Sequence, residues 1–159
     1  MKEQKVNILS NSVLKTADAV CFTSNGVIKK NGCLVMGAGV AKLFRDTIVG
    51  IDKRAGDAVN FSGNICQYIS SWSAAIGTSG ASRLVYVLAF PTKHHWRDKS
   101  SLDLIEGSAR RLMEIVKLNR FENVYLPRPG CCNGGLNWTK EVKPLLENIL
   151  DDRVTITYL

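Results

Sequence analysis

The chain has 159 residues, of which 45% are hydrophobic and 22% are charged, a composition that excludes an intrinsically disordered protein. Its formal charge of +7 is compatible with an anionic partner such as a nucleotide or a nucleic acid, although many basic proteins have no such partner. The length favours a single domain over residues 1–159. No apolar run approaches the ~20 residues of a membrane span, so we expect no membrane partner.

Nine segments of the chain have the apolar spacing of a strand or of a helix. In chain order they are a strand at 5–10, a strand at 18–25, a helix at 39–48, a strand at 64–72, a strand at 83–90, a helix at 101–118, a strand at 123–127, a helix at 139–150 and a strand at 153–159. Ser100 and Ser101 can cap the helix at 101–118, and the Gly- and Ser-rich stretch at 70–83 predicts a hairpin or a flexible loop. This alternation predicts an α/β sandwich, with helices on both faces of a mostly parallel sheet.

Two glycine-rich stretches each follow a predicted strand and precede a predicted helix. The first contains Met36-Gly37-Ala38-Gly39, and the second lies between Pro127 and Trp138, which we expect to anchor its ends. Glycine lets a backbone approach an anion closely, and a helix start supplies free N–H groups, so two such loops can hold a diphosphate. Tight turns are the alternative explanation. Neither stretch is a Walker loop, and GAGVAK departs from GxGxxG at Lys42, which argues against a nicotinamide cofactor.

The five cysteines are odd in number and include no CxxC pair. This usage argues against a disulfide framework and a zinc site, and it favours a reducing compartment. The N-terminal residues have no apolar stretch after their charges, so no secretory signal is expected. We therefore expect a cytoplasmic protein with no metal and no cofactor.

Four segments together resemble the macrodomain family: DAVCFTSNG, VMGAGVAKLF, FPTKHHWRDKSSLDLIEGS and LPRPGCCNGGLNW. They are most similar to the bacterial and phage branch that contains the terminal ADP-ribose glycohydrolase and the antitoxins that remove ADP-ribose from DNA. The resemblance implies a three-layer α/β/α sandwich with a mixed, mostly parallel sheet. It also implies that the ligand is ADP-ribose, free or attached to a macromolecule, with nucleic acid among the partners.

The resemblance also implies which residues form the site. Lys93, in Phe-Pro-Thr-Lys, matches the lysine that acts in the glycohydrolases, and Asn25 matches an asparagine that meets the distal ribose. Both are catalytic candidates. The implied ligand-binding residues are Asn25, Met36, Gly37, Ala38, Gly39, Val40, Arg128, Gly130, Cys131, Cys132, Asn133, Gly134, Gly135 and Leu136.

Lys93 also has a rationale in its own position. It follows an apolar strand end, where burial disfavours the charged form of an amine, and a neutral amine can attack the anomeric carbon of an ADP-ribosyl group. The alternative is a lysine that binds phosphate through its charge. His95 is a further catalytic candidate as an acid–base group, as is His94, although a structural histidine is more common. Cys131 and Cys132 are better explained as small packing residues than as nucleophiles.

Three positions depart from the family pattern. Gly134 stands where the terminal glycohydrolase has an aspartate in its second loop. Asn11 and Ser12 appear where macrodomains usually carry the Gly-Asp that reads the adenine amino group, and the segment at 26–35 is longer than in the antitoxins.

Three functions remain open from the sequence. The first is an enzyme that hydrolyses ADP-ribosyl linkages on nucleic acid or protein, or that hydrolyses ADP-ribose 1″-phosphate. The second is a non-catalytic reader that binds or sequesters ADP-ribose or a related nucleotide. The third, which has the least support, is a nucleic-acid-binding α/β domain without nucleotide chemistry.

Overall fold

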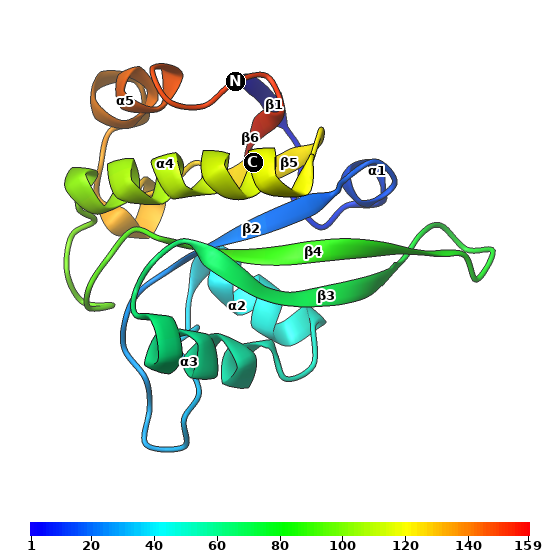
Figure 1. Ribbon diagram of the computed structural model, residues 1–159, viewed down its shortest axis with the longest axis horizontal. Coiled ribbons are helices and arrows are strands. Elements are labelled where there is room, and N and C mark those ends of the chain that lie inside the picture. Colours follow the sequence, from blue (N-terminus) through cyan, green and yellow to red (C-terminus); the bar gives the residue numbers. More distant parts are fainter.

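The computed structural model describes residues 1–159 and is built around one six-stranded sheet, with strand order β1-β6-β5-β2-β4-β3 (Figure 1). The strands are β1 (Lys2–Lys5), β2 (Ala19–Ser24), β3 (Gln67–Ala75), β4 (Ser82–Pro91), β5 (Val124–Pro127) and β6 (Val154–Tyr158). Neighbouring strands are parallel except β3 and β4, which are antiparallel. The predicted mixed, mostly parallel sheet is therefore confirmed.

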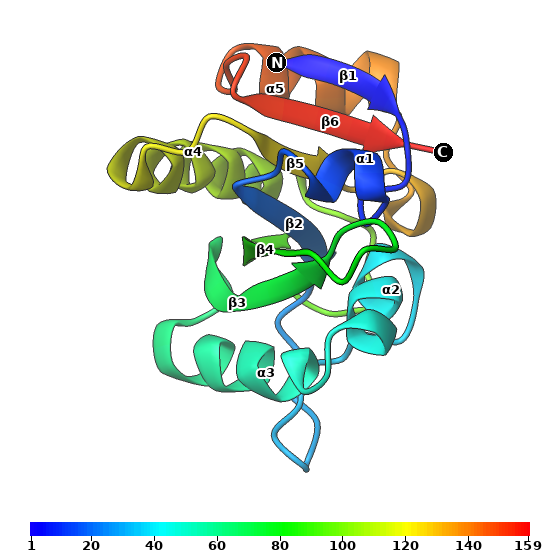
Figure 2. The same ribbon diagram turned by 90° about the vertical axis from the view of Figure 1, so that its right-hand side faces the viewer.

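Helices cover both faces of the sheet and complete the three layers (Figures 1 and 2). One face carries α1 (Asn11–Leu14), α2 (Gly39–Thr47) and α3 (Ile51–Ser62), and the other carries α4 (Leu102–Asn119), a π-helical turn at Trp138–Val142 and α5 (Lys143–Glu147). The Ser101 hydroxyl caps α4 by accepting a hydrogen bond from the N–H of Leu104 at 3.2 Å. None of these helices is both long and apolar enough to cross a membrane.

The sheet has a separate hydrophobic core on each face because side chains alternate along every strand. In β2, Val20 and Phe22 belong to the core under α2 and α3, while Ala19 and Cys21 belong to the core under α4. Phe22 meets Phe44 of α2 with ring centroids 5.4 Å apart. The two-sided burial explains why the central strands have nearly continuous apolar sequences.

The first strand is not where the sequence predicted it. The apolar residues at 5–10 suggested a strand there, but β1 comprises the exposed, mostly charged residues Lys2–Lys5. An edge strand is paired on one side only, and charged residues are common on such edges. The apolar residues that follow belong to a turn, and Ile8 is buried in the core.

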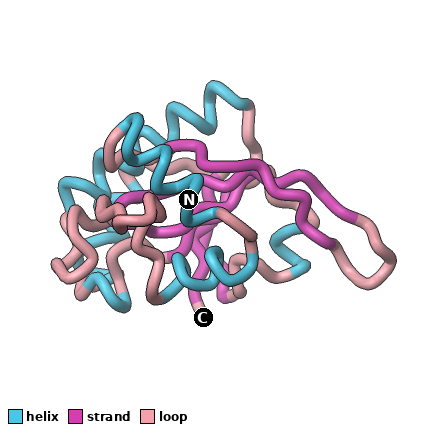
Figure 3. Tube along the Cα trace, turned by 90° about the horizontal axis from the view of Figure 1, so that it is seen from below, coloured by secondary structure: helices cyan, strands magenta, loops and turns pink.

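Two helices, α1 and α3, had no counterpart in the prediction. The buried stripe of α3 consists of Ile51, Ala55, Gly56 and Val59, and small residues produce only a weak apolar pattern. The stretch at 70–83 was correctly predicted to include a hairpin, although β3 and β4 extend through most of it and project beyond the helices (Figure 3).

The segment 26–35 forms a long excursion between β2 and α2 that extends past α3 (Figure 1). An isolated bridge joins Ile28 and Leu34 across it, and the N–H of Leu34 donates to the carbonyl of Asp52 at 2.9 Å. A Cβ on Gly56 would lie 1.9 Å from the carbonyl oxygen of Gly32. Only glycine at position 56 therefore allows the excursion to lie this close to α3.

Candidate functional site

A cavity of about 730 Å³ opens at the carboxyl edge of the sheet, where open α/β folds bind ligands. Its wall is formed by residues 6–8, 23–25, 35–41, 43, 92–93, 96, 100, 127–128, 130–134, 138 and 157–159. Small-molecule sites usually measure ~300–1,000 Å³, so a nucleotide-sized ligand suits this volume. The only charged side chains in the wall are those of Lys93 and Arg128, and no Asp or Glu contributes. The cavity therefore favours an anion.

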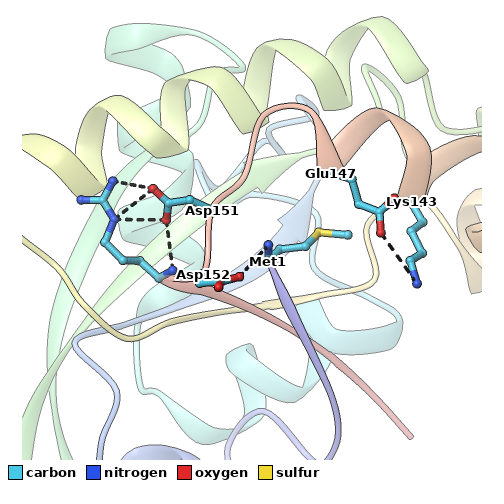
Figure 4. A network of polar contacts seen from close by, with 6 residues as sticks. Met1, Lys143, Glu147, Asp151 and Asp152 are labelled. Atoms are coloured by element: carbon cyan, nitrogen blue, oxygen red, sulfur yellow. Dashed lines mark hydrogen bonds and ion pairs between the residues drawn. The ribbon is translucent and has the colours of Figure 1, made fainter.

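A second hollow lies at the opposite edge of the sheet, where β1, β5 and β6 begin. It is lined only by polar residues, at positions 2, 122–123 and 151–153. Three of its charged residues form ion pairs: the N-terminal amine of Met1 lies 3.2 Å from Asp152, and Arg153 lies 2.7 Å from Asp151 (Figure 4). These ion pairs explain part of the hollow as a structural contact, and the candidate functional site is the cavity at the other edge.

The first glycine loop lies in the cavity wall, with Met36, Gly37, Ala38, Gly39 and Val40 all among the lining residues. A Cβ on Gly37 would have no heavy atom within 4 Å, so the backbone there is uncovered. Gly39 begins α2 with a φ of +57°, a conformation that favours glycine. The loop therefore presents bare backbone and a helix start to the cavity.

The second glycine loop contributes most of its predicted residues to the wall: Arg128, Gly130, Cys131, Cys132, Asn133 and Gly134. Gly135 and Leu136 lie outside the cavity. Gly135 ends the turn at Cys132–Gly134 with a φ of +73°, and the N–H of Leu136 donates to the carbonyl of Gly130 at 3.0 Å. These two residues therefore shape the loop and do not face the cavity.

Gly134 and Gly39 are each packed closely against a neighbouring side chain. A Cβ on Gly134 would lie 2.3 Å from the hydroxyl oxygen of Ser100, and a Cβ on Gly39 would lie 3.2 Å from the side-chain nitrogen of Asn133. Close packing at Gly134 explains a glycine at the position where the family resemblance in the sequence leads one to expect an aspartate. The two loops meet at Gly39 and Asn133.

Lys93 lies in the cavity wall at the end of β4, and its side-chain amine reaches the second loop. The amine donates to the carbonyl of Asn133 at 2.8 Å and to the carbonyl of Trp96 at 3.3 Å. The Lys93 carbonyl accepts a hydrogen bond from the amide of Asn64 at 2.9 Å. Both the backbone and the side chain of Lys93 are thus held in place before a ligand enters.

The other catalytic candidates have different surroundings, and His94 is exposed outside the cavity wall. Asn25 is buried in the cavity wall, where its amide nitrogen donates to the carbonyl of Val35 and its oxygen accepts from the N–H of Val27, both at 2.9 Å. These bonds tie both ends of the excursion at 26–35 to β2. His95 is exposed and does not line the cavity; its Nδ1 accepts from the N–H of Arg97 at 3.2 Å.

Arg128 is fixed in the wall by an ion pair and two aromatic rings. Its guanidinium lies 3.0 Å from the carboxylate of Glu3, 3.9 Å from the ring centre of Tyr158 and 5.0 Å from that of Trp138. Glu3 also accepts from the indole N–H of Trp138 at 3.1 Å and pairs with Lys143 at 2.7 Å. Hydrogen bonding by Lys143, followed by that of Arg128, lowers the pKa of the Glu3 carboxyl. The predicted anchoring of the loop by Trp138 is thus achieved through Glu3.

Sequence reasoning missed the parts of the wall that follow β1 and β6. Asn11 and Ser12, which were matched to the adenine-reading position, lie at the start of α1 outside the cavity, and the polar residue after β1 that lines it is Asn7. The misplaced first strand caused this error. The order of the strands could have identified these residues. Parallel strands end at the same edge of a sheet, so the residues after the first and last strands are expected beside the two glycine loops.

The two adjacent cysteines of the second loop are unpaired and differ in exposure. The thiol of Cys131 donates weakly to the carbonyl of Pro129 at 3.6 Å, and burial raises the pKa of this thiol to about 11. Thiolate chemistry at Cys131 is therefore disfavoured near neutral pH. Cys132 is exposed and has a φ of +22°.

Comparisons with curated proteins find relatives that match part of the chain, and no family model matches it. A DNA ADP-ribosyl glycohydrolase of Thermus aquaticus is 36% identical over 66 residues, which are 42% of this chain and 18% of that protein. A DNA ADP-ribosyl transferase–DNA ADP-ribosyl glycohydrolase fusion protein of Thermosipho africanus is 34% identical over 61 residues, 38% of this chain and 16% of that protein. The matched segments span less than a fifth of either relative.

Comparisons of structure extend over nearly the whole chain. The macrodomain of Thermus aquaticus DarG has a TM-score of 0.70 and 26% identity, and the match covers 99% of this chain and 97% of that one. Thermosipho africanus DarTG in complex with ADP-ribose has a TM-score of 0.69 and 23% identity, with 89% of this chain and 38% of that chain covered. The similarity therefore includes every layer of the sandwich.

Proposed function

The chain belongs to the macrodomains, as its sequence motifs predicted, and we propose that its cavity binds ADP-ribose and that it hydrolyses the linkage between ADP-ribose and a base of DNA. The observation that carries the proposal is that Lys93 and the two glycine loops lie together in the wall of one cavity. The amine of Lys93 contacts Asn133 in the second glycine loop, and Asn133 faces Gly39 in the first.

The binding step is supported by the charge and shape of the wall. A diphosphate brings negative charge, and the wall contains two cationic side chains, of which Arg128 already pairs with Glu3, and no Asp or Glu side chain. Backbone N–H groups at a glycine-rich helix start hold phosphate oxygens well, and the first glycine loop offers uncovered backbone at Gly37, directly before α2. We therefore place the diphosphate between Gly37 and Asn133.

The hydrolytic step is assigned to Lys93. In its neutral form the amine attacks the anomeric carbon of the distal ribose while the bond from that carbon to the base breaks, and the proton that the amine then loses goes to the departing base. Water then releases ADP-ribose and regenerates the amine. The carbonyls of Asn133 and Trp96 position the amine for this attack, because a neutral amine can donate its two N–H groups to them while its lone pair bonds to carbon.

The test is a titration with ADP-ribose by calorimetry, followed by an assay on a single-stranded DNA oligonucleotide that carries ADP-ribose on a base. We expect saturable binding with one site per chain and release of ADP-ribose from the oligonucleotide. A protein that binds no ADP-ribose would contradict the whole proposal. Release from a modified protein carboxylate, with none from DNA, would contradict the substrate assignment alone.

A second candidate function is a reader that binds ADP-ribose without cleaving it. The observation in its favour is the lack of any Asp or Glu side chain in the wall, so no side-chain carboxylate can act there as a general base. Tight binding of ADP-ribose together with no turnover of any modified oligonucleotide would identify the reader.

A further inference from the structure

Three consecutive flat side chains form an exposed surface beside the cavity, which we call the Trp96 ledge (His95, Trp96 and Arg97). The imidazole of His95 is stacked on the indole of Trp96, with ring centroids 5.5 Å apart and 24° between the planes. The guanidinium of Arg97 lies 4.6 Å from the centre of the same indole. Trp96 lines the cavity and is still 44% exposed. A large aromatic group therefore remains open to solvent at the cavity mouth.

The ledge is held firmly although it belongs to a loop. The carbonyl of Trp96 accepts a hydrogen bond from the amine of Lys93, and the carbonyl of His94 accepts one from the N–H of Gly26 at 3.0 Å. The rings also pack on one another before any partner binds. A preordered surface loses little conformational entropy on binding, which favours a role in recognition.

The charge around the ledge selects an anionic partner. The segment from Lys93 to Lys99 contains three cations and a single carboxylate, that of Asp98. Gly26 joins this segment to the excursion, whose exposed tip carries Lys29 and Lys30. Flat aromatic groups among cations are the combination that binds single-stranded nucleic acid, because bases stack on the rings and phosphates pair with the cations.

We propose that the Trp96 ledge binds the unpaired bases of a single-stranded nucleic acid that flank the nucleotide held at the cavity. This inference rests on the proposed function, since the ledge adjoins the amine of Lys93 to which we assign the cleavage. A base within a duplex is already stacked on both sides, so a duplex cannot offer its bases to the ledge. The ledge is thus a positioning surface that selects single strands.

The experiment measures how an unmodified single-stranded DNA oligonucleotide and its duplex bind to the parent, Trp96→Ala and Trp96→Phe. Stacking of one base on an aromatic side chain corresponds to roughly a tenfold change in affinity or more, so Trp96→Ala should weaken single-strand binding about tenfold. Trp96→Phe should restore most of that loss. Phe61→Ala is the matched control, because Phe61 is an aromatic residue on α3 that is 93% exposed and lies outside the cavity wall.

Three outcomes would contradict the proposed role of the Trp96 ledge. Trp96→Ala could bind the single strand as tightly as the parent does, or it could lose as much affinity for the duplex or for free ADP-ribose as for the single strand. The last of these would make Trp96 a part of the nucleotide pocket. The proposed function has its own readout. A parent that binds no ADP-ribose, but whose single-strand binding depends on Trp96, would support the ledge and contradict the proposed function.

Discussion

The side-chain amine of Lys93 donates a 2.8 Å hydrogen bond to the main-chain carbonyl of Asn133, a residue 40 positions later in the chain. This bond joins the end of β4 to the loop that follows β5, across the intervening strand β2. Asn133 is also the residue that faces Gly39 at the start of α2. A change at any of these positions should therefore affect the geometry of the other two.

Lys93→Ala should abolish release of ADP-ribose from a modified oligonucleotide while ADP-ribose affinity falls only a fewfold, because we assign the diphosphate contacts to the loop backbone. Lys93→Arg should be nearly as inactive, since a guanidinium stays charged and does not attack carbon. Single-turnover assays and calorimetry measure the two effects. Lys140→Ala is the control, as Lys140 is exposed outside the wall. Full activity of Lys93→Ala would move the chemistry to another residue.

Gly37→Val should fold normally yet lose most of its affinity for ADP-ribose. No atom lies within 4 Å of a Cβ at this position, so the new side chain strains nothing and covers the backbone that we assign to phosphate. Thermal unfolding and calorimetry together separate folding from binding. The phosphate assignment would fail if the folded variant bound ADP-ribose as well as the parent does.

Gly134→Ala should instead reduce stability, because its Cβ would lie 2.3 Å from the Ser100 hydroxyl oxygen. Overpacking of this kind costs about 1–3 kcal/mol of unfolding free energy. Denaturant titration of the parent, Gly134→Ala and Gly134→Ala with Ser100→Ala gives the measurement. The double variant keeps the Cβ of residue 100 at 3.0 Å, so it should recover part of the loss and not all of it. Equal stability of Gly134→Ala and the parent would contradict the close packing.

Gly56→Ala should destabilise the protein by about 1–3 kcal/mol, because its Cβ would lie 1.9 Å from the carbonyl oxygen of Gly32. Gly107→Ala, in α4, is the matched control. Nothing lies within 4 Å of a Cβ there, so alanine should stabilise that helix by ~0.5–1 kcal/mol. Unfolding in urea compares the two variants. A Gly56→Ala variant as stable as Gly107→Ala would show that the excursion does not contact α3.

Glu3→Gln should make stability less dependent on pH in the acid range. Lys143 and Arg128 hold the folded-state pKa of Glu3 below its ordinary value of 4.5, so the ionised carboxylate stabilises the fold above that pH. This contribution is lost as pH falls through the lowered folded-state pKa. The melting temperatures of parent and variant should therefore differ at pH 7 and approach one another as the pH falls below 4.5. A difference that stays constant from pH 7 to pH 3 would exclude the ion pairs as its cause.

Binding of an ADP-ribosylated oligonucleotide should weaken with salt more steeply than binding of free ADP-ribose. Each phosphate–cation contact adds roughly 0.7–0.9 to the slope of log affinity against log salt concentration. A double variant, Lys29→Ala with Lys30→Ala, should lower the slope for the oligonucleotide by about 1–2 and leave that for ADP-ribose unchanged, since neither lysine lines the cavity. Identical slopes for both ligands would contradict a role of the excursion in binding nucleic acid.

Local spacing in the sequence was enough to predict much of the fold. β2, β4, β5 and α4 were all predicted because burial on two faces, or on one helical face, requires apolar residues at fixed intervals. The glycine loops were placed correctly for a similar reason. A loop between a parallel strand and a helix must lie at the carboxyl edge of the sheet, so its position follows from the order of the elements.

The tertiary structure alone decided which residues of these segments face the cavity. Gly134 lines it and Gly135 does not, although both are glycines in one turn, because backbone dihedrals and contact with Ser100 direct the chain there. The start of β1 was likewise decided by pairing with β6 at the sheet edge, where charged residues suffice and no apolar pattern is required. The contact between Lys93 and Asn133 joins residues distant in sequence, and neither spacing nor composition specifies which distant residues the packed sheet brings together.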